Sequence, residues 1–140
     1  TGTKVTFQPD PEIFESCEFS LETLSHRLRE MAFLNRGLTI ELEDKRVEKQ
    51  ISFHYEGGII SFVEHLNKTK TPIYKEVIYI QKEVDDNLIE VAMQHNDGYV
   101  ENVYTFANNI NTQEGGTHLS GFRSALTRSL CKEKQFTKRE

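Results

Sequence analysis

VAMQHNDGYVENVYTFANNINTQEGGTHLSGFRSALTR, residues 91–128, carries the strongest structural signals of the chain. Asn96-Asp97-Gly98 joins two strand-like runs, residues 88–94 and 99–106. It predicts a hairpin, because these three residue types tolerate positive φ. Gly115-Gly116-Thr117 then precedes an amphipathic helix, whose apolar positions are Leu119, Phe122, Leu126 and Leu130. A hairpin followed by a helix indicates that strands and helices are mixed.

Upstream of this stretch the pattern alternates between helix and strand. Ser20 is a suitable N-cap for a helix that Gly37 ends, and a second helix begins near Gly57-Gly58. Strand periodicity marks residues 3–7, 38–42, 51–55 and 76–80, and the second and third of these form a predicted hairpin. Residues 68–72 form a polar loop. The fold class expected is α+β, with mixed or antiparallel sheets packed against helices.

Composition excludes several classes of protein. The 140 residues are 36% apolar and 28% charged, which is typical of a globular domain. No apolar run approaches the roughly 20 residues of a membrane span, and the first residues do not form a signal peptide. A cytoplasmic protein without a membrane partner is therefore expected. Cys17 and Cys131 belong to no cluster and are expected to be reduced thiols.

Charge is unevenly distributed along the chain. The net charge of −5 disfavours nonspecific coating of nucleic acid, but residues 123–140 contain six basic and two acidic side chains. Arg123 and Arg128 lie in this basic part, on the predicted last helix. A face toward DNA is expected there. The alternative is a solvated tail.

The sequence contains no self-contained active site. Five histidines stand without metal-ligand spacing, and neither a phosphate-binding Gly-Lys loop nor a pair of catalytic carboxylates is present. Gly115-Gly116-Thr117 at a helix start offers free backbone amides for an anion, although glycines at such a turn are more often conformational.

Four long stretches resemble the DNA gyrase B family of bacterial type II topoisomerases. Besides residues 91–128, the matching stretches are GTKVTFQPDPEIF (residues 2–14), LREMAFLNRG (28–37) and HYEGGIISFVEHLNKTKTPIY (54–74). The related topoisomerase IV B subunit shares most of the pattern and is the near alternative. A mismatch-repair ATPase and a stand-alone nucleic-acid-binding module are more distant candidates.

The resemblance implies a fold and a role. Residues 1–68 resemble the C-terminal part of a GHKL-type ATPase domain, and residues 69–140 resemble the N-terminal part of a transducer domain with a left-handed βαβ-type fold. The parent protein would bind ATP and Mg²⁺, and the implied partners are DNA, the gyrase A subunit and a second copy of the B subunit. The chain would couple ATP binding and dimer closure to DNA strand passage and supercoiling. The 68–72 loop would be a joint between the two parts.

Three residues acquire roles by the resemblance. Thr3 would help to hold adenine through a water molecule at the edge of the nucleotide site, and Arg123 would face the cavity through which DNA passes. Arg128 is a second candidate for that face. The family's catalytic glutamate, Mg²⁺-binding asparagine, glycine-rich lid and γ-phosphate lysine have no counterpart here, so no cofactor is expected to bind this chain alone. Residues 131–140 depart from the family's continuing helix and are expected to be a divergent tail.

Overall fold

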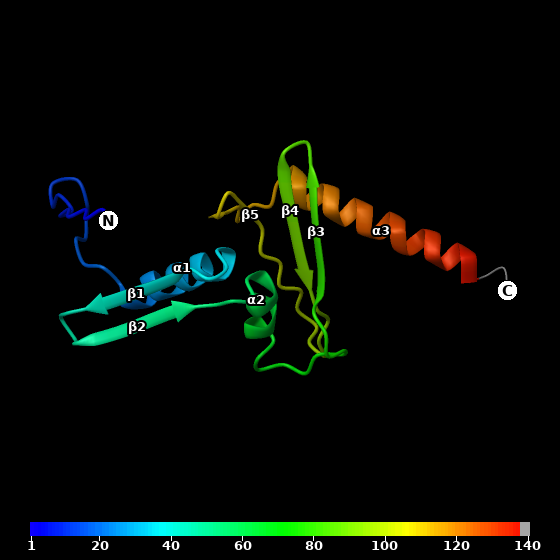
Figure 1. The fold of residues 1–140 in the computed structure, drawn as a ribbon, viewed down its shortest axis with the longest axis horizontal. Coiled ribbons are helices and arrows are strands. Elements are labelled where there is room, and N and C mark those ends of the chain that lie inside the picture. Colours follow the sequence, from blue (N-terminus) through cyan, green and yellow to red (C-terminus); the bar gives the residue numbers. More distant parts are fainter. Residues whose placement is uncertain (138–140) are drawn as a thin grey trace. The chain divides into compact units, whose positions relative to one another are not determined.

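The computed structural model describes residues 1–137 of the chain, and side-chain surroundings to residue 132. The chain forms two compact units, Thr1–Asn96 and Asp97–Glu140. The elements follow in the order α1 (Leu21–Leu34), β1 (Thr39–Asp44), β2 (Lys49–His54), α2 (Ile59–Leu66), β3 (Ile78–Val84), β4 (Asn87–Met93), β5 (Phe106–Ala107), β6 (Ile110–Asn111) and α3 (Thr117–Thr137) (Figure 1). The strands pair as three antiparallel hairpins, β1–β2, β3–β4 and β5–β6.

Helix α1 forms as its sequence predicts. The Oγ atom of Ser20 accepts a hydrogen bond of 3.2 Å from the backbone N–H of Thr23, which satisfies one of the free amides of the first turn. After the helix ends at Leu34, Gly37 adopts a φ of +74°, a conformation that favours glycine. The N-cap and the glycine stop are both confirmed.

The core of the first unit lies between α1, α2 and the β1–β2 hairpin. Phe33 and Phe53 are almost completely buried, and the ring of Phe33 stacks on Tyr55 and on Phe62 with centroid distances of 3.7 Å and 5.1 Å. The register pairs Ile40 with Phe53, so the alternating apolar residues share one face. Figure 1 shows α1 lying along this hairpin. The predicted hairpin and second helix are confirmed.

The second hairpin does not form where the sequence predicts it. Asp85 and Asp86 both adopt positive φ, 48° and 61°, and join β3 to β4 by a two-residue turn of the kind that suits a hairpin. Asn96 instead forms a bridge with Pro72, and residues 99–105 contain no strand. The prediction of a hairpin at Asn96-Asp97-Gly98 was therefore wrong. The preceding strand already pairs with β3, and Asn96 is engaged elsewhere.

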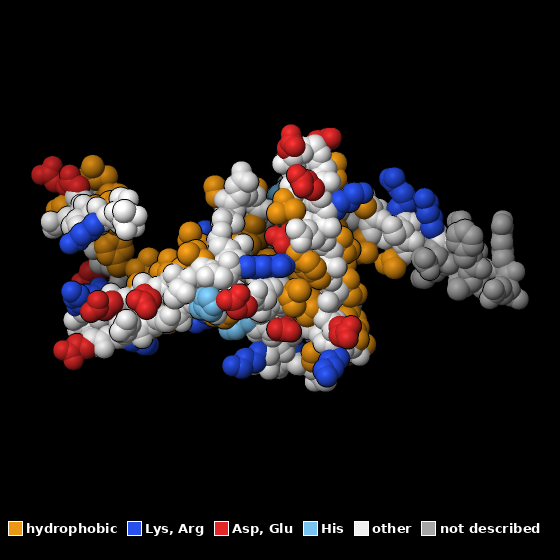
Figure 2. Space-filling view, viewed as in Figure 1, with side chains coloured by type: hydrophobic (Ala, Val, Ile, Leu, Met, Phe, Trp, Pro, Cys, Tyr) orange, Lys and Arg blue, Asp and Glu red, His pale blue; other side chains and the backbone are white. Residues whose placement is uncertain are grey.

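The two faces of the β3–β4 hairpin differ in chemistry. Cross-strand partners lie on the same face, and one face carries the pairs Ile78–Met93 and Ile80–Val91. Ile78 and Ile80 are nearly half exposed, and hydrophobic side chains gather over this hairpin in Figure 2. The other face carries Tyr79 and Glu90. Strand alternation thus separates an apolar face from a polar one.

The second unit consists of the short β5–β6 hairpin and α3. Asn108 and Asn109 form its turn with φ values of 48° and 66°. Helix α3 begins at Thr117, as predicted, and runs to Thr137. The expectation of a divergent tail at residues 131–140 was wrong as far as Thr137, because the helix continues without a break. The side chains of Lys134, Lys138 and Arg139, part of the predicted basic end, lie outside the described residues.

The strand predicted at residues 3–7 is absent from the structure. A strand is stable only when its backbone amides and carbonyls pair with a neighbour, and no described residue forms a ladder with this segment. Val5 and Phe7 are accordingly 80% and 74% exposed. The α+β class is confirmed. The left-handed βαβ connection and the domain boundary at residue 68 stay predictions.

Candidate functional site

Thr3, the residue expected beside adenine, lies in the exposed segment that precedes α1. The segment has no regular secondary structure, and Thr3 makes no hydrogen bond to another described residue. A Cβ atom at the neighbouring Gly2 would meet no atom within 4 Å. The structure therefore builds no nucleotide pocket around Thr3 from the described residues, and its adenine role remains a prediction.

Arg123 is placed on α3 by the helical pattern and is held by a carboxylate. Its Nη2 atom donates to both carboxylate oxygens of Glu101, each at 3.3 Å. The two side chains are 54% and 72% exposed, so water weakens their attraction. Arg123 is thus an oriented but accessible guanidinium, the group that binds a phosphate without reading bases.

An open hollow of about 320 Å³ lies beside Arg123, within the second unit. Its base is closed by Thr105 and Thr112: each hydroxyl donates 3.0 Å to the backbone oxygen of the other residue. Leu119 of α3 forms an apolar part of its lining. The lining contains both Glu101 and Arg123, so this hollow does not present a field of one sign.

The helix start at Gly115-Gly116 explains the two glycines by conformation. Their φ values are +81° and +134°, which side chains other than glycine rarely adopt. The Gly116 carbonyl oxygen accepts from the backbone N–H of Ser120 at 3.1 Å, and the Oγ of Thr112 lies 3.2 Å from Nε2 of His118. The conformational interpretation of this motif is sufficient, and anion binding there stays a prediction.

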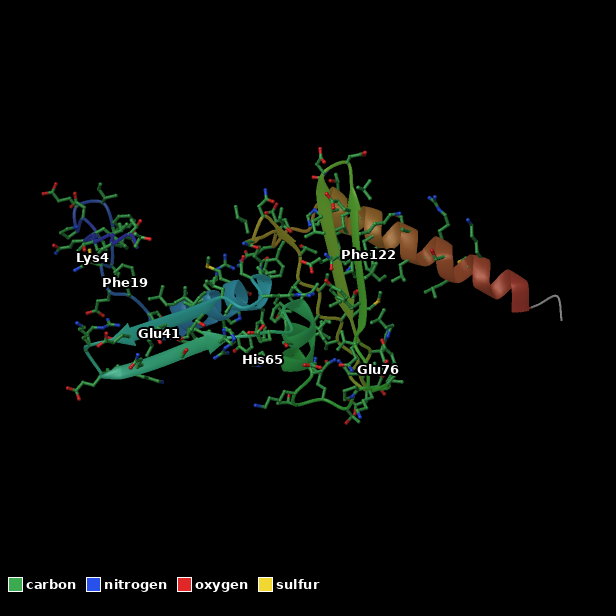
Figure 3. All side chains as sticks on the ribbon, viewed as in Figure 1. Lys4, Phe19, Glu41, His65, Glu76 and Phe122 are labelled. Carbon is green, nitrogen blue, oxygen red and sulfur yellow. The ribbon has the colours of Figure 1, made fainter. Side chains whose placement is uncertain are left out.

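Arg128 also lies on α3 and is exposed. At about 100° per residue, five residues turn the helix through more than one full circle, so Arg123 and Arg128 point in different directions. Arg128 makes no hydrogen bond or ion pair with another described side chain. Figure 3 labels Phe122, one of the apolar positions predicted for the same helix. The two arginines share a helix but not a stripe.

A polar cluster that the sequence did not indicate joins α1 to the β3–β4 hairpin. Nη2 of Arg36 donates 2.7 Å to the Tyr79 hydroxyl and 3.3 Å to Oε1 of Glu90. The guanidinium carbon also lies 5.1 Å from the centre of the Tyr79 ring. The Tyr79 hydroxyl donates to Glu90, and this hydrogen bond raises the pKa of Tyr79. We call these three residues the arginine cluster.

Gly58 makes room for the arginine cluster. A Cβ atom built on Gly58 would lie 2.5 Å from Nε of Arg36, and Gly58 adopts φ +59° at the start of α2. The arginine side chain therefore crosses the bare backbone of Gly58 on its way to Tyr79. Helical and strand periodicity cannot reveal such a contact, because the residues are separated by more than twenty positions.

A second polar cluster fixes the end of α2. Nδ2 of Asn67 donates 2.8 Å to Oε1 of Gln94, and Nδ2 of Asn96 donates 2.8 Å to Oδ1 of Asn67. Asn67 is buried, with 8% of its surface exposed. The only sequence signal for this cluster is the polar run that follows β4. We call Asn67, Gln94 and Asn96 the amide chain.

The residues that the structure describes contain no group of three or more acidic, histidine or cysteine side chains that would hold a metal ion. Within the same part of the chain, none of the helices has the length and apolar character needed to cross a bilayer. Cys17 and Cys131 are both exposed and unbridged.

Solved structures share this fold. The 43K ATPase domain of Thermus thermophilus gyrase B, solved in complex with an aminocoumarin, superimposes with a TM-score of 0.77 at 34% identity over 94% of this chain and 36% of that one. The B-subunit of the Myxococcus xanthus DNA gyrase superimposes with a TM-score of 0.82 at 27% identity, covering 89% of this chain and 36% of that one. The α+β arrangement is therefore that of gyrase B ATPase-region structures.

Curated relatives carry the same name. The DNA gyrase B subunit of Clostridium acetobutylicum is 59% identical over 92% of this chain, and that of Halalkalibacterium halodurans is 55% identical over 93%. The chain spans about a fifth of the length of these two relatives, 20% and 21%. The family model described as DNA gyrase B matches residues 58–139, which includes most of the stretch expected to be divergent. This match covers more than half of the residues, and the chain belongs to the DNA gyrase B family.

Proposed function

We propose that this chain is the connecting segment of a type II topoisomerase B subunit. Residues 1–68 complete the ATPase domain, and residues 69–140 begin the transducer. The segment passes the effect of ATP binding and dimer closure to DNA strand passage. The observation that carries the proposal is the length of the similarity, 59% identity over 92% of the chain to a gyrase B protein. Similarity that spans both parts without interruption supports one continuous mechanical element.

The chemistry of the described residues supports a connector. Hydrolysis of ATP needs groups that position water and stabilise developing charge on the phosphate. Neither a metal-binding cluster nor a phosphate loop is present in the described part of the chain. ATP and Mg²⁺ are thus assigned to the rest of the parent protein, with Thr3 contributing at most an edge contact to adenine.

The proposed partners are DNA, the gyrase A subunit and a second copy of the B subunit, in the cytoplasm. Arg123 and Arg128 are the proposed contacts to DNA, because exposed guanidinium groups bind phosphate through several N–H donors. Glu101 holds Arg123 at 3.3 Å in an exposed ion pair. A phosphate would replace this carboxylate at small cost, since exposed pairs contribute little.

A chimeric protein tests the proposal. The corresponding segment of Clostridium acetobutylicum gyrase B, 59% identical, is replaced by this chain, and the chimera is reconstituted with its A subunit and plasmid DNA. We expect ATP-dependent supercoiling close to that of the unchanged enzyme. A well-folded chimera that hydrolyses ATP but never supercoils DNA would refute the connector function.

The arginines are tested in the same chimera. Replacing Arg123 and Arg128 by glutamine removes two phosphate contacts, so DNA-stimulated turnover is expected to weaken and to lose part of its salt dependence. Lys82→Gln, a matched loss of positive charge on β3, is the control. Equal effects of the double variant and of Lys82→Gln would contradict a specific role for α3.

A further inference from the structure

The amide chain is a continuous run of hydrogen bonds with one direction. Asn96 donates to Asn67, Asn67 donates to Gln94, and Nε2 of Gln94 donates to the carbonyl oxygens of Tyr74 and Lys75 at 3.0 Å and 3.2 Å. Each side chain in the middle therefore uses its oxygen as an acceptor and its nitrogen as a donor. Turning either amide over would place like atoms against each other, so the chain holds a single arrangement.

The position of the amide chain in the fold is equally specific. Asn67 is the C-cap of α2, whose backbone N–H donates 3.0 Å to the carbonyl oxygen of Val63. Gln94 directly follows β4. The cluster therefore connects the last turn of α2 to the end of β4, two elements that also pack against each other (Figure 1).

The same cluster closes the base of the 68–72 loop. The backbone N–H of Ile73 donates 2.9 Å to the carbonyl oxygen of His95, and Pro72 bridges Asn96. Both ends of the loop are thus tied to residues 94–96. A loop pinned at its base does not absorb a displacement of α2, because the displacement is carried through the buried amides to β4.

We propose that the amide chain is the positioning element that makes the end of α2 and the end of β4 move as one body, and that it thereby couples the ATPase part to the transducer part. The proposal rests on the proposed function, since Asn67 precedes the predicted domain boundary and Gln94 and Asn96 follow it. Asn67 is only 8% exposed, and buried amides hold their geometry more firmly than exposed ones. None of the three residues is assigned to the binding of nucleotide or DNA.

Isosteric acids test the direction of the hydrogen bonds while preserving volume. Asn67→Asp replaces the donor that faces Gln94 with a second acceptor. Gln94→Glu directs a carboxylate at the carbonyl oxygens of Tyr74 and Lys75. Asn96→Ala removes only the first donor and is the mildest of the three changes. Asn102→Asp, at an exposed asparagine of the second unit, is the matched change of amide to acid.

The measurement is the number of supercoils introduced per ATP hydrolysed by the chimeric gyrase. For Asn67→Asp and Gln94→Glu we expect ATP hydrolysis to stay within about twofold and the supercoils per ATP to fall about tenfold, a typical coupling effect. Asn96→Ala should lower the same ratio less, and Asn102→Asp should leave it unchanged. A merely structural role would lower hydrolysis and supercoiling together and would leave their ratio constant.

Three results would overturn the proposal. The first is an unchanged ratio in all three variants. The second is a parallel loss of both activities with a lowered unfolding temperature in the two acid variants, together with a normal ratio in Asn96→Ala. The third is an equal fall in Asn102→Asp. Failure of the proposed function is distinguishable from these, because the chimera with the unaltered segment would then already lack supercoiling.

Discussion

The imidazole of His65 packs against the ring of Phe33 with a centroid distance of 5.5 Å, and His65 comes from α2 (Figure 3). Partial burial lowers the pKa of His65 below its ordinary value of 6.5, and the positive charges of Arg29 and Lys68 lower it further. A lowered pKa in the folded state means that protonation favours the unfolded chain. This histidine thus links the stability of the α1–α2 contact to pH.

We predict that the free energy of unfolding falls modestly as the pH drops below 6.5, the ordinary value, and is unaffected by His65 above it. The fall is complete once the pH is below the lowered pKa of the folded state. Chemical denaturation at a series of pH values measures it. His65→Gln removes the titrating group, so its profile should be flatter in this window. An identical slope in the variant would contradict the assignment to His65.

Ser20 allows a second prediction at this scale. Its hydroxyl caps Thr23 N–H, and replacement by alanine leaves that amide without its protein acceptor. Ser20→Ala should therefore lower the free energy of unfolding by about 1 kcal/mol. Ser20→Asp keeps an acceptor at the N-cap and should restore most of the loss. Urea titration of the three proteins provides the comparison, and equal stability of all three would show that the cap is unimportant.

At the scale of elements, the β3–β4 hairpin is attached to the rest of its unit through polar contacts at two places. The arginine cluster ties its polar face to the residue that follows α1, and the amide chain ties its end to α2. A two-stranded hairpin is only marginally stable by itself in water. These contacts, together with the packing of α2 on β4, therefore account for its order within the first unit.

Gly58→Ala tests the arginine cluster. The new methyl group meets Arg36 and forces a left-handed backbone on alanine, so a loss of about 1–3 kcal/mol is expected. Arg36→Ala in the same chain removes the steric part, and the double variant should lose less than the sum of the single losses. Gly121→Ala on α3 is the control, because a Cβ there meets nothing within 4 Å and alanine favours a helix. Strict additivity would contradict the contact.

At the scale of the whole molecule, the chain contains the geometry of a lever and lacks the chemistry of an ATPase. Its buried hydrophobic residues are few among those described, namely Ala32, Phe33, Phe53 and Phe62. Polar clusters and hairpin turns supplement this small core. Such an architecture transmits displacement through fixed contacts, in agreement with the proposed connector.

The corresponding prediction concerns the isolated polypeptide. It is expected to bind ATP negligibly and to hydrolyse none, because the groups that would align water with the γ-phosphate are not among its residues. Isothermal titration with ATP and Mg²⁺, and a phosphate-release assay on a preparation free of other ATPases, measure both quantities. Turnover that persists through purification and copies the profile of the protein on a column would refute the prediction.

Much of the fold follows from local sequence alone. The N-cap at Ser20, the glycine stop at Gly37 and the helix start at Thr117 each depend on a few neighbouring residues, and the structure confirms all three. The α+β class follows from the same local patterns. The site was less predictable: Arg123 was placed on its helix, but its pairing with Glu101 depends on a loop that the pattern wrongly assigned to a strand.

The sequence by itself determined where helices begin and end, which residues have conformational roles, and to which family the chain is similar. Only the tertiary structure decided which strands pair, that Asp85-Asp86 rather than Asn96-Asp97-Gly98 makes the hairpin turn, and that Asn67 meets Gln94 and Asn96. The physical reason is the range of the interactions. Caps and turns depend on backbone geometry within a few residues, whereas strand pairing and buried amide contacts depend on segments brought together by folding.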